Sequence, residues 1–314
     1  MLLVFYIIKS LKLKKCVKIL SMNEIYKNNE KEIILKNMDA FNPEHIFLCG
    51  QAFRWELEED GSFTNVAHDR VINISKKEKD IIIKNSDEDD FNKIWRNYFD
   101  LNRDYLKIIN DLSEDQVLKR AIEYGRGIRI LNQDPFETII SFIISANNNI
   151  KRIKKSIKII SQMYGEKIEN PFGTYYSFPK AEVLKNADPK DLREFAKVGF
   201  RDERIVKAAN MIYDEEIDIN SFYTKDLKLA SEELQKLPGV GPKVSDCILL
   251  FAYGRSESFP VDVWIKRVME ELYFKETVKK TEVADRGREL FKDFAGFAQQ
   301  YLFFYGRENK LGKI

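Results

Sequence analysis

The chain has 314 residues, of which 44% are hydrophobic, and this size and content suit a globular protein of one large or two ordinary domains. Its 52 Lys and Arg residues nearly balance 50 Asp and Glu, so the net charge of +2 gives no sign of a polyanionic partner. The cysteines Cys16, Cys49 and Cys247 lie far apart, which excludes a Cys cluster for zinc or iron–sulfur and fits a reducing compartment. We expect a cytoplasmic protein without a metal or other cofactor.

The chain begins with a short apolar run, Leu2 to Ile8, followed by lysines rather than by a small-residue cleavage site. Such a run is too short to span a membrane, and we expect no membrane partner. A secretory signal is the less favoured alternative. Residues 1–22 are interpreted as a disordered extension or a mis-assigned start, with Met22 as the initiator.

Residues 23–115 are expected to form a small N-terminal domain built on an antiparallel sheet. Between Gln51 and Asn85, aromatic and aliphatic residues recur in short runs between polar ones, and Asp60-Gly61 is a hairpin-turn signal. The pattern predicts strands at 53–57, 63–66, 71–74 and 81–83.

After the acidic run 86–90, apolar residues recur at intervals of three and four, which predicts helices through residues 116–314. Two helix starts are marked by an aspartate before a proline, at Asp134-Pro135 and Asp188-Pro189. The segment 170–179 contains Pro and Gly and is interpreted as a loop. The predicted fold class is therefore α+β, with a small antiparallel-sheet domain followed by all-α domains.

The most informative helical stretch is 228–252, where one apolar helix ends at Pro238-Gly239 and a second begins after Gly241. This is the pattern of a helix-hairpin-helix. The glycines allow a tight turn, and the second helix directs its unpaired N–H groups out of the hairpin. We expect the backbone of Gly239, Val240 and Gly241 to bind a DNA phosphate.

Lys243 lies in the first turn of the second helix. A neutral lysine amine is a nucleophile for carbon, whereas a charged one contacts phosphate, as in hairpin modules without enzymatic activity. On the hairpin alone, the phosphate contact is favoured. Cys247 follows four residues later on the same helix face, where a buried structural thiol is the default interpretation.

Asp262 lies nineteen residues after Lys243, directly before a new apolar period, and is a natural N-cap. A carboxylate at that helix start, facing the amine, would also stabilise a developing sugar cation or handle protons. Taken alone, the structural role as a cap is favoured.

Several separated motifs change this weighting. The Leu-Pro-Gly-Val-Gly-Pro-Lys hairpin at 237–243 and the Val-Asp-Val at 261–263 resemble the helix-hairpin-helix DNA glycosylase superfamily. The stretches Cys-Gly-Gln-Ala-Phe-Arg-Trp at 49–55, Ser-Ala-Asn-Asn-Asn-Ile at 145–150 and Gly-Phe-Ala-Gln at 296–299 narrow the resemblance to the 8-oxoguanine DNA glycosylases. A lysine in the hairpin marks the bifunctional members, which also cleave the abasic strand.

The resemblance implies a small antiparallel-sheet domain followed by helical domains, in agreement with the pattern above, and no iron–sulfur cluster. It implies that Lys243 attacks C1′ of the damaged nucleotide, and that Asp262 assists departure of the base and supports the sugar cation. The resulting Schiff base permits strand cleavage by β-elimination. The implied partner is double-stranded DNA that contains 8-oxoguanine, bound by a monomer.

The resemblance assigns four residues to the flipped base. Gly50 would offer its backbone carbonyl to the N7 proton that distinguishes 8-oxoguanine from guanine. Gln299 would bind the Watson–Crick edge, while Phe303 and Cys247 would pack against the two faces of the base. Without the family, Gly50 is interpreted as a turn glycine and Phe303 as a core aromatic.

Four further residues are assigned to the opposite strand. Asn147 matches the family residue that fills the gap left by the flipped base and contacts the orphan cytosine. Arg152 and Arg201 match donors to the same orphan base, and Phe200 takes the place of an intercalating wedge. Each arginine is otherwise interpreted as a surface cation or a phosphate clamp.

Two departures from the family pattern stand out. Trp264 follows Val-Asp-Val where familiar members have a histidine that contacts phosphate, and Pro242 removes one N–H from the hairpin. One alternative is a glycosylase of the same superfamily for another damaged base, against which Gly50 and Gln299 argue. The other alternative is a non-catalytic helix-hairpin-helix DNA-binding module.

Overall fold

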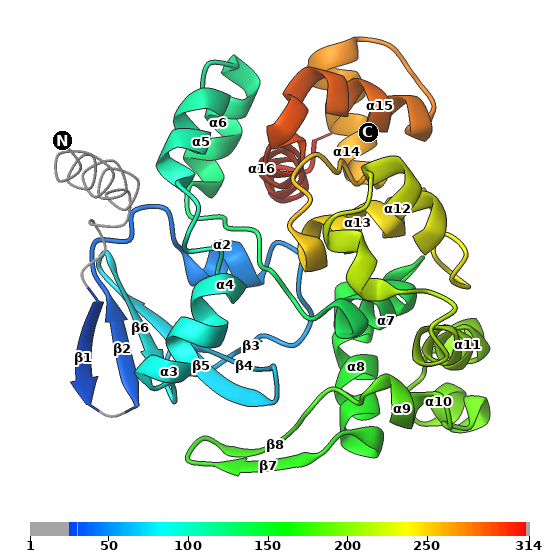
Figure 1. The fold of residues 1–314 in the computed structure, drawn as a ribbon. Helices are drawn as coiled ribbons and strands as arrows, with labels where there is room; N and C mark the ends of the chain where they lie inside the picture. Colours follow the sequence, from blue (N-terminus) through cyan, green and yellow to red (C-terminus); the bar gives the residue numbers. More distant parts are fainter. Residues whose placement is uncertain (1–24, 30, 312–314) are drawn as a thin grey trace, which may run out of the picture.

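The computed structural model describes residues 25–29 and 31–311, so the expected extension 1–22 lies outside the described residues. An antiparallel sheet forms one side of the molecule and helices form the other (Figure 1). The predicted order, with the sheet first and the helical region second, is confirmed. In the part of the chain that the structure describes, no helix is long and apolar enough to cross a membrane.

The main sheet has six strands in the order β1-β2-β6-β5-β4-β3, and all neighbours are antiparallel. Ile74 on β5 pairs with Phe63 on β4 and with Ile83 on β6, and all three are buried. This apolar row fixes the register, because a slip of one residue would turn it to solvent. The strands are β1 (Ile25–Asn29), β2 (Glu32–Leu35), β3 (Glu56–Leu57), β4 (Phe63–Ala67), β5 (Arg70–Lys77) and β6 (Asp80–Lys84).

The predicted strands at 63–66, 71–74 and 81–83 are confirmed as β4, β5 and β6. The predicted strand 53–57 is reduced to β3, since Phe53 and Trp55 are buried in packing contacts before the strand begins. The sequence pattern does not predict β1 and β2. Ile33 on β2 pairs with Ile83 far along the chain, and such long-range pairing leaves no local turn signal.

Most helices come after the main sheet in the sequence, and some of them pack against it. The predicted starts are confirmed: the Asp134 carboxylate accepts the Glu137 N–H at 2.8 Å, and that of Asp188 accepts the Lys190 N–H at 2.8 Å. The helices are α2 (Pro43–Phe47), α3 (Glu88–Asp90), α4 (Arg96–Tyr98), α5 (Tyr105–Leu112), α6 (Gln116–Gly125), α7 (Pro135–Ser145), α8 (Ile150–Tyr164), α9 (Ala181–Leu184), α10 (Pro189–Glu194), α11 (Asp202–Tyr213), α12 (Leu227–Leu234), α13 (Pro242–Tyr253), α14 (Val263–Met269), α15 (Lys280–Phe291) and α16 (Ala295–Glu308).

The interpretation of 170–179 as a loop, within an otherwise helical region, was wrong. Strands β7 (Lys167–Asn170) and β8 (Gly173–Tyr176) form a two-stranded antiparallel hairpin below α8 (Figure 1). Pro171 and Phe172 make its turn, while Ile168 and the paired Tyr175 supply the β-branched and aromatic residues that favour strands. The turn signal was recognised, but the strands beside it are too short and polar to stand out.

Two hydrophobic cores support these layers. The first lies on the sheet, where Phe47 stacks on Trp55 with ring centres 3.6 Å apart. The second surrounds α7 and α13, and it also takes in α5 from the expected N-terminal domain. Phe53 belongs to the second core, although Ala52 and Trp55 beside it belong to the first. The loop between α2 and β3 is therefore fixed between the two cores.

Candidate active site

The predicted helix-hairpin-helix is confirmed as α12 and α13 with the turn 237–241 between them. The Val240 N–H donates to the Leu237 carbonyl at 3.1 Å, which closes the turn. Gly239 has a φ of +92°, and a Cβ there would lie 3.3 Å from Arg204 Cδ and from Ile143 Cγ2. Only glycine fits this position without strain.

The first turn of α13 is open to an anion. Gly241 is its N-cap, in extended conformation, and no atom of the described residues lies within 4 Å of where a Cβ would be. Pro242 at the first helical position has no N–H, and the Ser245 N–H donates to the Gly241 carbonyl at 2.9 Å. The N–H groups of Lys243 and Val244 therefore face the open side, where the helix dipole favours negative charge.

Lys243 and Asp262 line one small pocket between α13, α14, α16 and the loop after α2. Lys243 is partly buried, and its Nζ lies 5.3 Å from the centre of the Phe142 ring. All predicted catalytic and base-binding residues line this pocket: Lys243, Asp262, Gly50, Cys247, Gln299 and Phe303. Gly50 and Phe303, which are 253 positions apart in the sequence, thus meet at one place.

Asp262 is the N-cap of α14 and also faces the pocket. Its side chain accepts the Ile265 N–H at 2.8 Å, as expected for a cap. Burial raises the pKa of its carboxyl group, while the Ile265 N–H and the positive charge of Lys243 oppose that rise. The capping bond engages one oxygen of the Asp262 carboxylate, so the carboxylate has a fixed position in the pocket that Lys243 also lines.

Cys247 lies one helical turn after Lys243 and is 3% exposed. Burial raises the pKa of its thiol to about 11, although the charge of Lys243 and a hydrogen bond with it act in the opposite direction. The thiol is therefore neutral near pH 7. A neutral, polarisable sulfur on a pocket wall suits contact with a flat ring.

Gly50 also lines the pocket. Its φ of +84° belongs to the left-handed region, and a Cβ there would lie 3.6 Å from the Phe303 ring. The Arg307 Nη2 donates to the Leu48 carbonyl at 2.9 Å and ties this loop to α16. The loop and the helix that carries Phe303 are thus held together.

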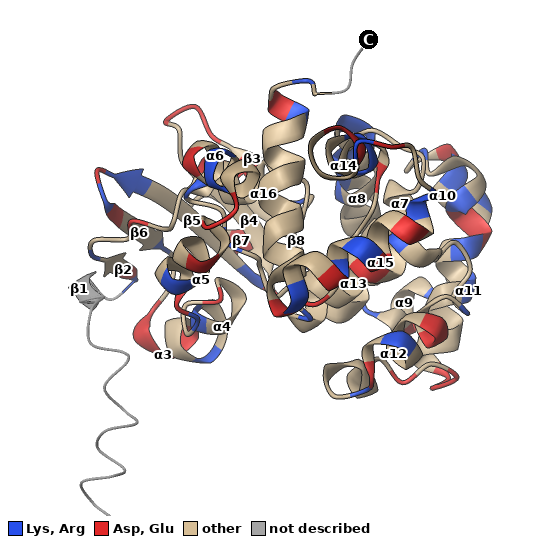
Figure 2. Cartoon of the chain, turned by 90° about the horizontal axis from the view of Figure 1, so that it is seen from above, with Lys and Arg blue, Asp and Glu red and all other residues tan. Residues whose placement is uncertain are grey.

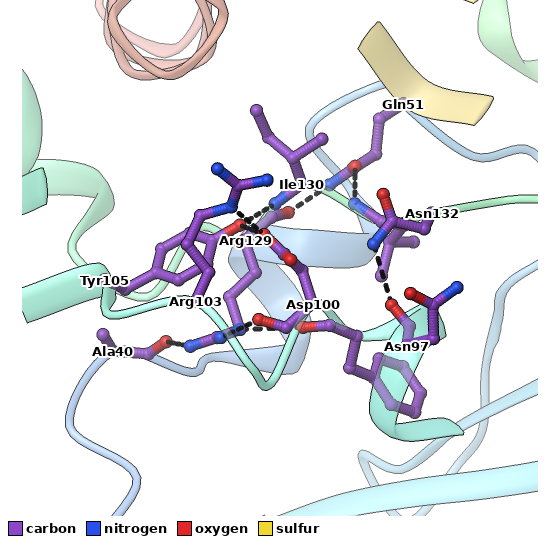
Figure 3. Close-up of polar contacts among 11 residues, drawn as sticks. Ala40, Gln51, Asn97, Asp100, Arg103, Tyr105, Arg129, Ile130 and Asn132 are labelled. Carbon is purple, nitrogen blue, oxygen red and sulfur yellow. Dashed lines mark hydrogen bonds and ion pairs between the residues drawn. The ribbon is translucent and has the colours of Figure 1, made fainter. Parts of the chain in front are cut away.

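Gln51 anchors the loop from inside. Its Nε2 donates to the carbonyls of Ile46 and Arg129 at 3.0 and 2.7 Å, and its Oε1 accepts the Leu131 N–H at 2.8 Å. Figure 3 shows this amide next to the segment 129–132. Gln51 is fully buried, so its bonds fix the direction of the Gly50 peptide beside it. Sequence reasoning quoted Gln51 in a motif but gave it no role.

The helix α16 supplies the remaining wall. Gln299 is 4% exposed, and Phe303, one turn later, is partly buried. Five further residues line the pocket and had no predicted role there: Cys49, Phe142, Phe251, Pro260 and Gln300. A signal was present for Gln300, since two consecutive glutamines interrupt the apolar sequence of α16.

The residues assigned to the opposite strand lie on the loop after α7, in the first turn of α8 and in the short helical turn Gly199–Arg201. Asn147 is exposed with a φ of +52°, and it lines a larger groove together with Lys243 and Asp262. Phe200 is 55% exposed, as an intercalating ring requires. Arg152 is exposed in the first turn of α8.

Arg201 differs from this picture because its guanidinium already binds the protein. Its Nη1 donates to the Val198 carbonyl at 2.9 Å, and its Nη2 donates to the Asn147 carbonyl at 3.0 Å and to that of Ala146. The side chain is 6% exposed. Its hydrogen bonds hold the Asn147 loop in place, and few donors are left over for a base.

The net charge conceals an uneven surface. Figure 2 shows basic and acidic segments spread over many elements, with α16 almost uncharged. The helix α8, directly after the Asn147 loop, is an exception with basic residues and no acidic ones. Such a helix beside the groove suits a phosphate backbone.

A metal site was not expected. Among the described residues, no group of three or more His, Cys, Asp or Glu side chains is arranged to hold a metal ion.

Two family models match the chain. One is described as the 8-oxoguanine DNA glycosylase N-terminal domain and matches residues 33–139. The other is described as the HhH-GPD superfamily base excision DNA repair protein and matches residues 140–293. Their junction falls inside α7.

Known proteins are similar over much of their length. A probable N-glycosylase/DNA lyase of Methanothermobacter thermautotrophicus is 33% identical over 218 residues, which cover 63% of this chain and 69% of the relative. An N-glycosylase/DNA lyase of Saccharomyces cerevisiae is 30% identical over 274 residues, 78% of this chain and 69% of the relative. The solved 8-oxoguanine glycosylase/lyase of Clostridium acetobutylicum, in complex with duplex DNA containing cytosine opposite 8-oxoguanine, is 42% identical. Its TM-score is 0.88, over 93% of this chain and 99% of that structure.

Proposed function

Because the chain belongs to the 8-oxoguanine DNA glycosylase family of the helix-hairpin-helix superfamily, we propose that it excises 8-oxoguanine from duplex DNA and then cleaves the abasic strand. The observation that carries this proposal is the convergence of Lys243 and Asp262 on one pocket with the base-binding candidates. A lysine that only contacts phosphate, in a non-catalytic module, needs no such pocket and no partly buried carboxylate beside it.

Lys243 is the proposed nucleophile. Its neutral amine attacks C1′ of the flipped nucleotide, and the bond from C1′ to N9 breaks with its electron pair leaving on the base. The base takes up a proton and departs. The aminal then opens to an imine between Lys243 and C1′, loss of a C2′ proton follows, and the 3′ phosphate leaves by β-elimination.

Asp262 is proposed to act as a carboxylate. As the bond to the base stretches, positive charge develops on the sugar ring, and a negative group held beside it lowers the barrier. The Ile265 N–H fixes the carboxylate before the substrate arrives, so no reorganisation is needed during the reaction.

The lesion is proposed to lie between Cys247 and Phe303. The Gly50 carbonyl would accept the N7–H of 8-oxoguanine, whereas guanine would present a lone pair to the same oxygen. Gln51 keeps that peptide from rotating away, and Gln299 would bind the Watson–Crick edge.

The orphan base is proposed to meet Asn147 and Arg152, with Phe200 inserted between base steps. Arg201 is proposed to hold the Asn147 loop through its backbone bonds rather than to act as the main donor to the base. The hairpin amides of Gly239 and Gly241 and the first turn of α13 would bind a phosphate, whereas the predicted Val240 N–H already donates to the Leu237 carbonyl.

The partner is double-stranded DNA, and we propose that a single chain binds it, because one chain supplies every residue of the proposed site. The cytoplasmic location expected from the cysteine content remains a prediction.

A single-turnover excision assay across lesions and opposite bases tests the substrate. We expect 8-oxoguanine opposite cytosine to be released, with guanine at the same position untouched. Faster release of an alkylated base would instead indicate a glycosylase of the same superfamily for another lesion, and binding without release would indicate a non-catalytic DNA-binding module.

A further inference from the structure

Gln300 places a second amide in the base pocket. Gln299 and Gln300 are 4% and 3% exposed, and both line the pocket. Successive side chains on a helix point about 100° apart. Here the two amides meet nevertheless, because Gln300 Nε2 donates to Gln299 Oε1 at 2.8 Å. This bond fixes which way round the Gln299 amide is presented.

The hydrogen bond between Gln300 and Gln299 leaves one acceptor and one donor of the two amides without a protein partner. Gln300 Oε1 is buried and has no hydrogen-bond partner among the described residues. Gln299 Nε2 donates to no described residue either. A buried amide oxygen without a partner is costly and uncommon, so a polar ligand is expected to meet the Gln300 oxygen.

We propose that Gln300 determines specificity: its side-chain oxygen accepts a hydrogen bond from the 2-amine of flipped 8-oxoguanine, while its nitrogen holds Gln299. This inference rests on the proposed function. The Watson–Crick edge of 8-oxoguanine carries an acceptor at O6 and donors at N1 and at the 2-amine. The glutamine pair offers a donor at Gln299 Nε2 for O6 and two acceptors for the N1 proton and the 2-amine, at Gln299 Oε1, which keeps one lone pair after the bond to Gln300, and at Gln300 Oε1.

Omission of the 2-amine from the substrate gives a direct test. The base 8-oxohypoxanthine keeps O6 and the N1 and N7 protons but lacks the 2-amine. In single-turnover assays, the wild-type protein should release 8-oxoguanine about tenfold faster than 8-oxohypoxanthine, since the latter leaves the Gln300 oxygen unpaired. The variant Gln300→Met keeps the side-chain length without the amide, and it should release both bases at similar rates.

One further variant separates recognition from folding. Tyr301→Phe removes the buried, unpartnered hydroxyl of the next residue on α16, which does not line the pocket, and it should keep the wild-type preference.

The outcomes distinguish the two proposals. Failure of the wild-type protein to release 8-oxoguanine contradicts the proposed function. An unchanged ratio of the two release rates in Gln300→Met, or loss of the preference in Tyr301→Phe, contradicts the role of Gln300.

Discussion

Asp262 combines two roles in one carboxylate. It caps α14 through the Ile265 N–H, and it lies beside Lys243 in the pocket. Asparagine caps helices about as well as aspartate but carries no charge. The two roles are therefore separable by substitution.

Asp262→Asn should leave the stability within about 0.5 kcal/mol of the wild-type value, because the cap remains. Excision should fall at least about 100-fold, because the charge that stabilises the sugar cation is lost. Asp262→Ala should lose the same activity and also about 1 kcal/mol of stability. Thermal unfolding and single-turnover excision measure the two effects, and full activity in Asp262→Asn would limit Asp262 to capping.

The sequence predicted the site residues where a motif carried them, and the pocket brings those assigned to catalysis and the base together. It did not predict Gln300 or Phe142, since a buried residue on a helix has the same pattern whether it packs or lines a cavity. It also did not predict that Arg201 binds backbone carbonyls, because an arginine's partners depend on loops whose shape the local sequence does not specify.

At the level of elements, the hairpin turn depends on two glycines for different reasons. Gly239 has a positive φ and is crowded by Arg204 and Ile143, whereas Gly241 is extended and open to solvent. The sequence pattern indicates both glycines as turn residues and does not distinguish them.

The same serine substitution at each glycine tests this difference. Gly239→Ser should destabilise the protein by about 2 kcal/mol, through backbone strain and crowding. Gly241→Ser should be neutral within about 0.5 kcal/mol, because serine is a favoured N-cap. Chemical denaturation measures both variants, and equal losses would contradict the turn geometry.

The fold was predicted best where the pattern is local. The capped helices and the strands β4 to β6 follow from neighbouring residues and turn signals. The strands β1 and β2 were missed because β2 gains its place by pairing with β6 across a long stretch of chain. The β7–β8 hairpin was missed because only its turn is distinctive.

At the scale of the whole molecule, the segment 128–133 joins the two cores. The Arg129 guanidinium, 4% exposed, donates to the carbonyls of Phe99, Ala40 and Asp100 at 2.9, 3.1 and 2.6 Å. It also lies 3.8 Å from the centre of the Tyr105 ring, as Figure 3 illustrates. The same segment also forms hydrogen bonds with Gln51, next to Gly50. It therefore contacts both the core on the sheet and the loop that lines the base pocket.

Arg129→Met should therefore destabilise the protein by about 3 kcal/mol, since three buried carbonyls lose their donor at about 1 kcal/mol each. Excision should also slow, because Gln51 and the Gly50 loop lose part of their support. Arg70→Met, at the exposed start of the inner strand β5, is the control and should change neither quantity measurably. An unchanged free energy of unfolding in Arg129→Met would show that the segment 128–133 does not join the two cores.

The central claim is that Lys243 forms a covalent imine with the abasic sugar. The most direct measurement is borohydride reduction during incubation with duplex DNA that contains 8-oxoguanine opposite cytosine. We predict a covalent protein–DNA adduct for the wild-type protein, and for Lys243→Gln no adduct and no base release but retained lesion binding through the pocket and the hairpin. Absence of the adduct in the wild-type protein, or an undiminished adduct in Lys243→Gln, would contradict the claim.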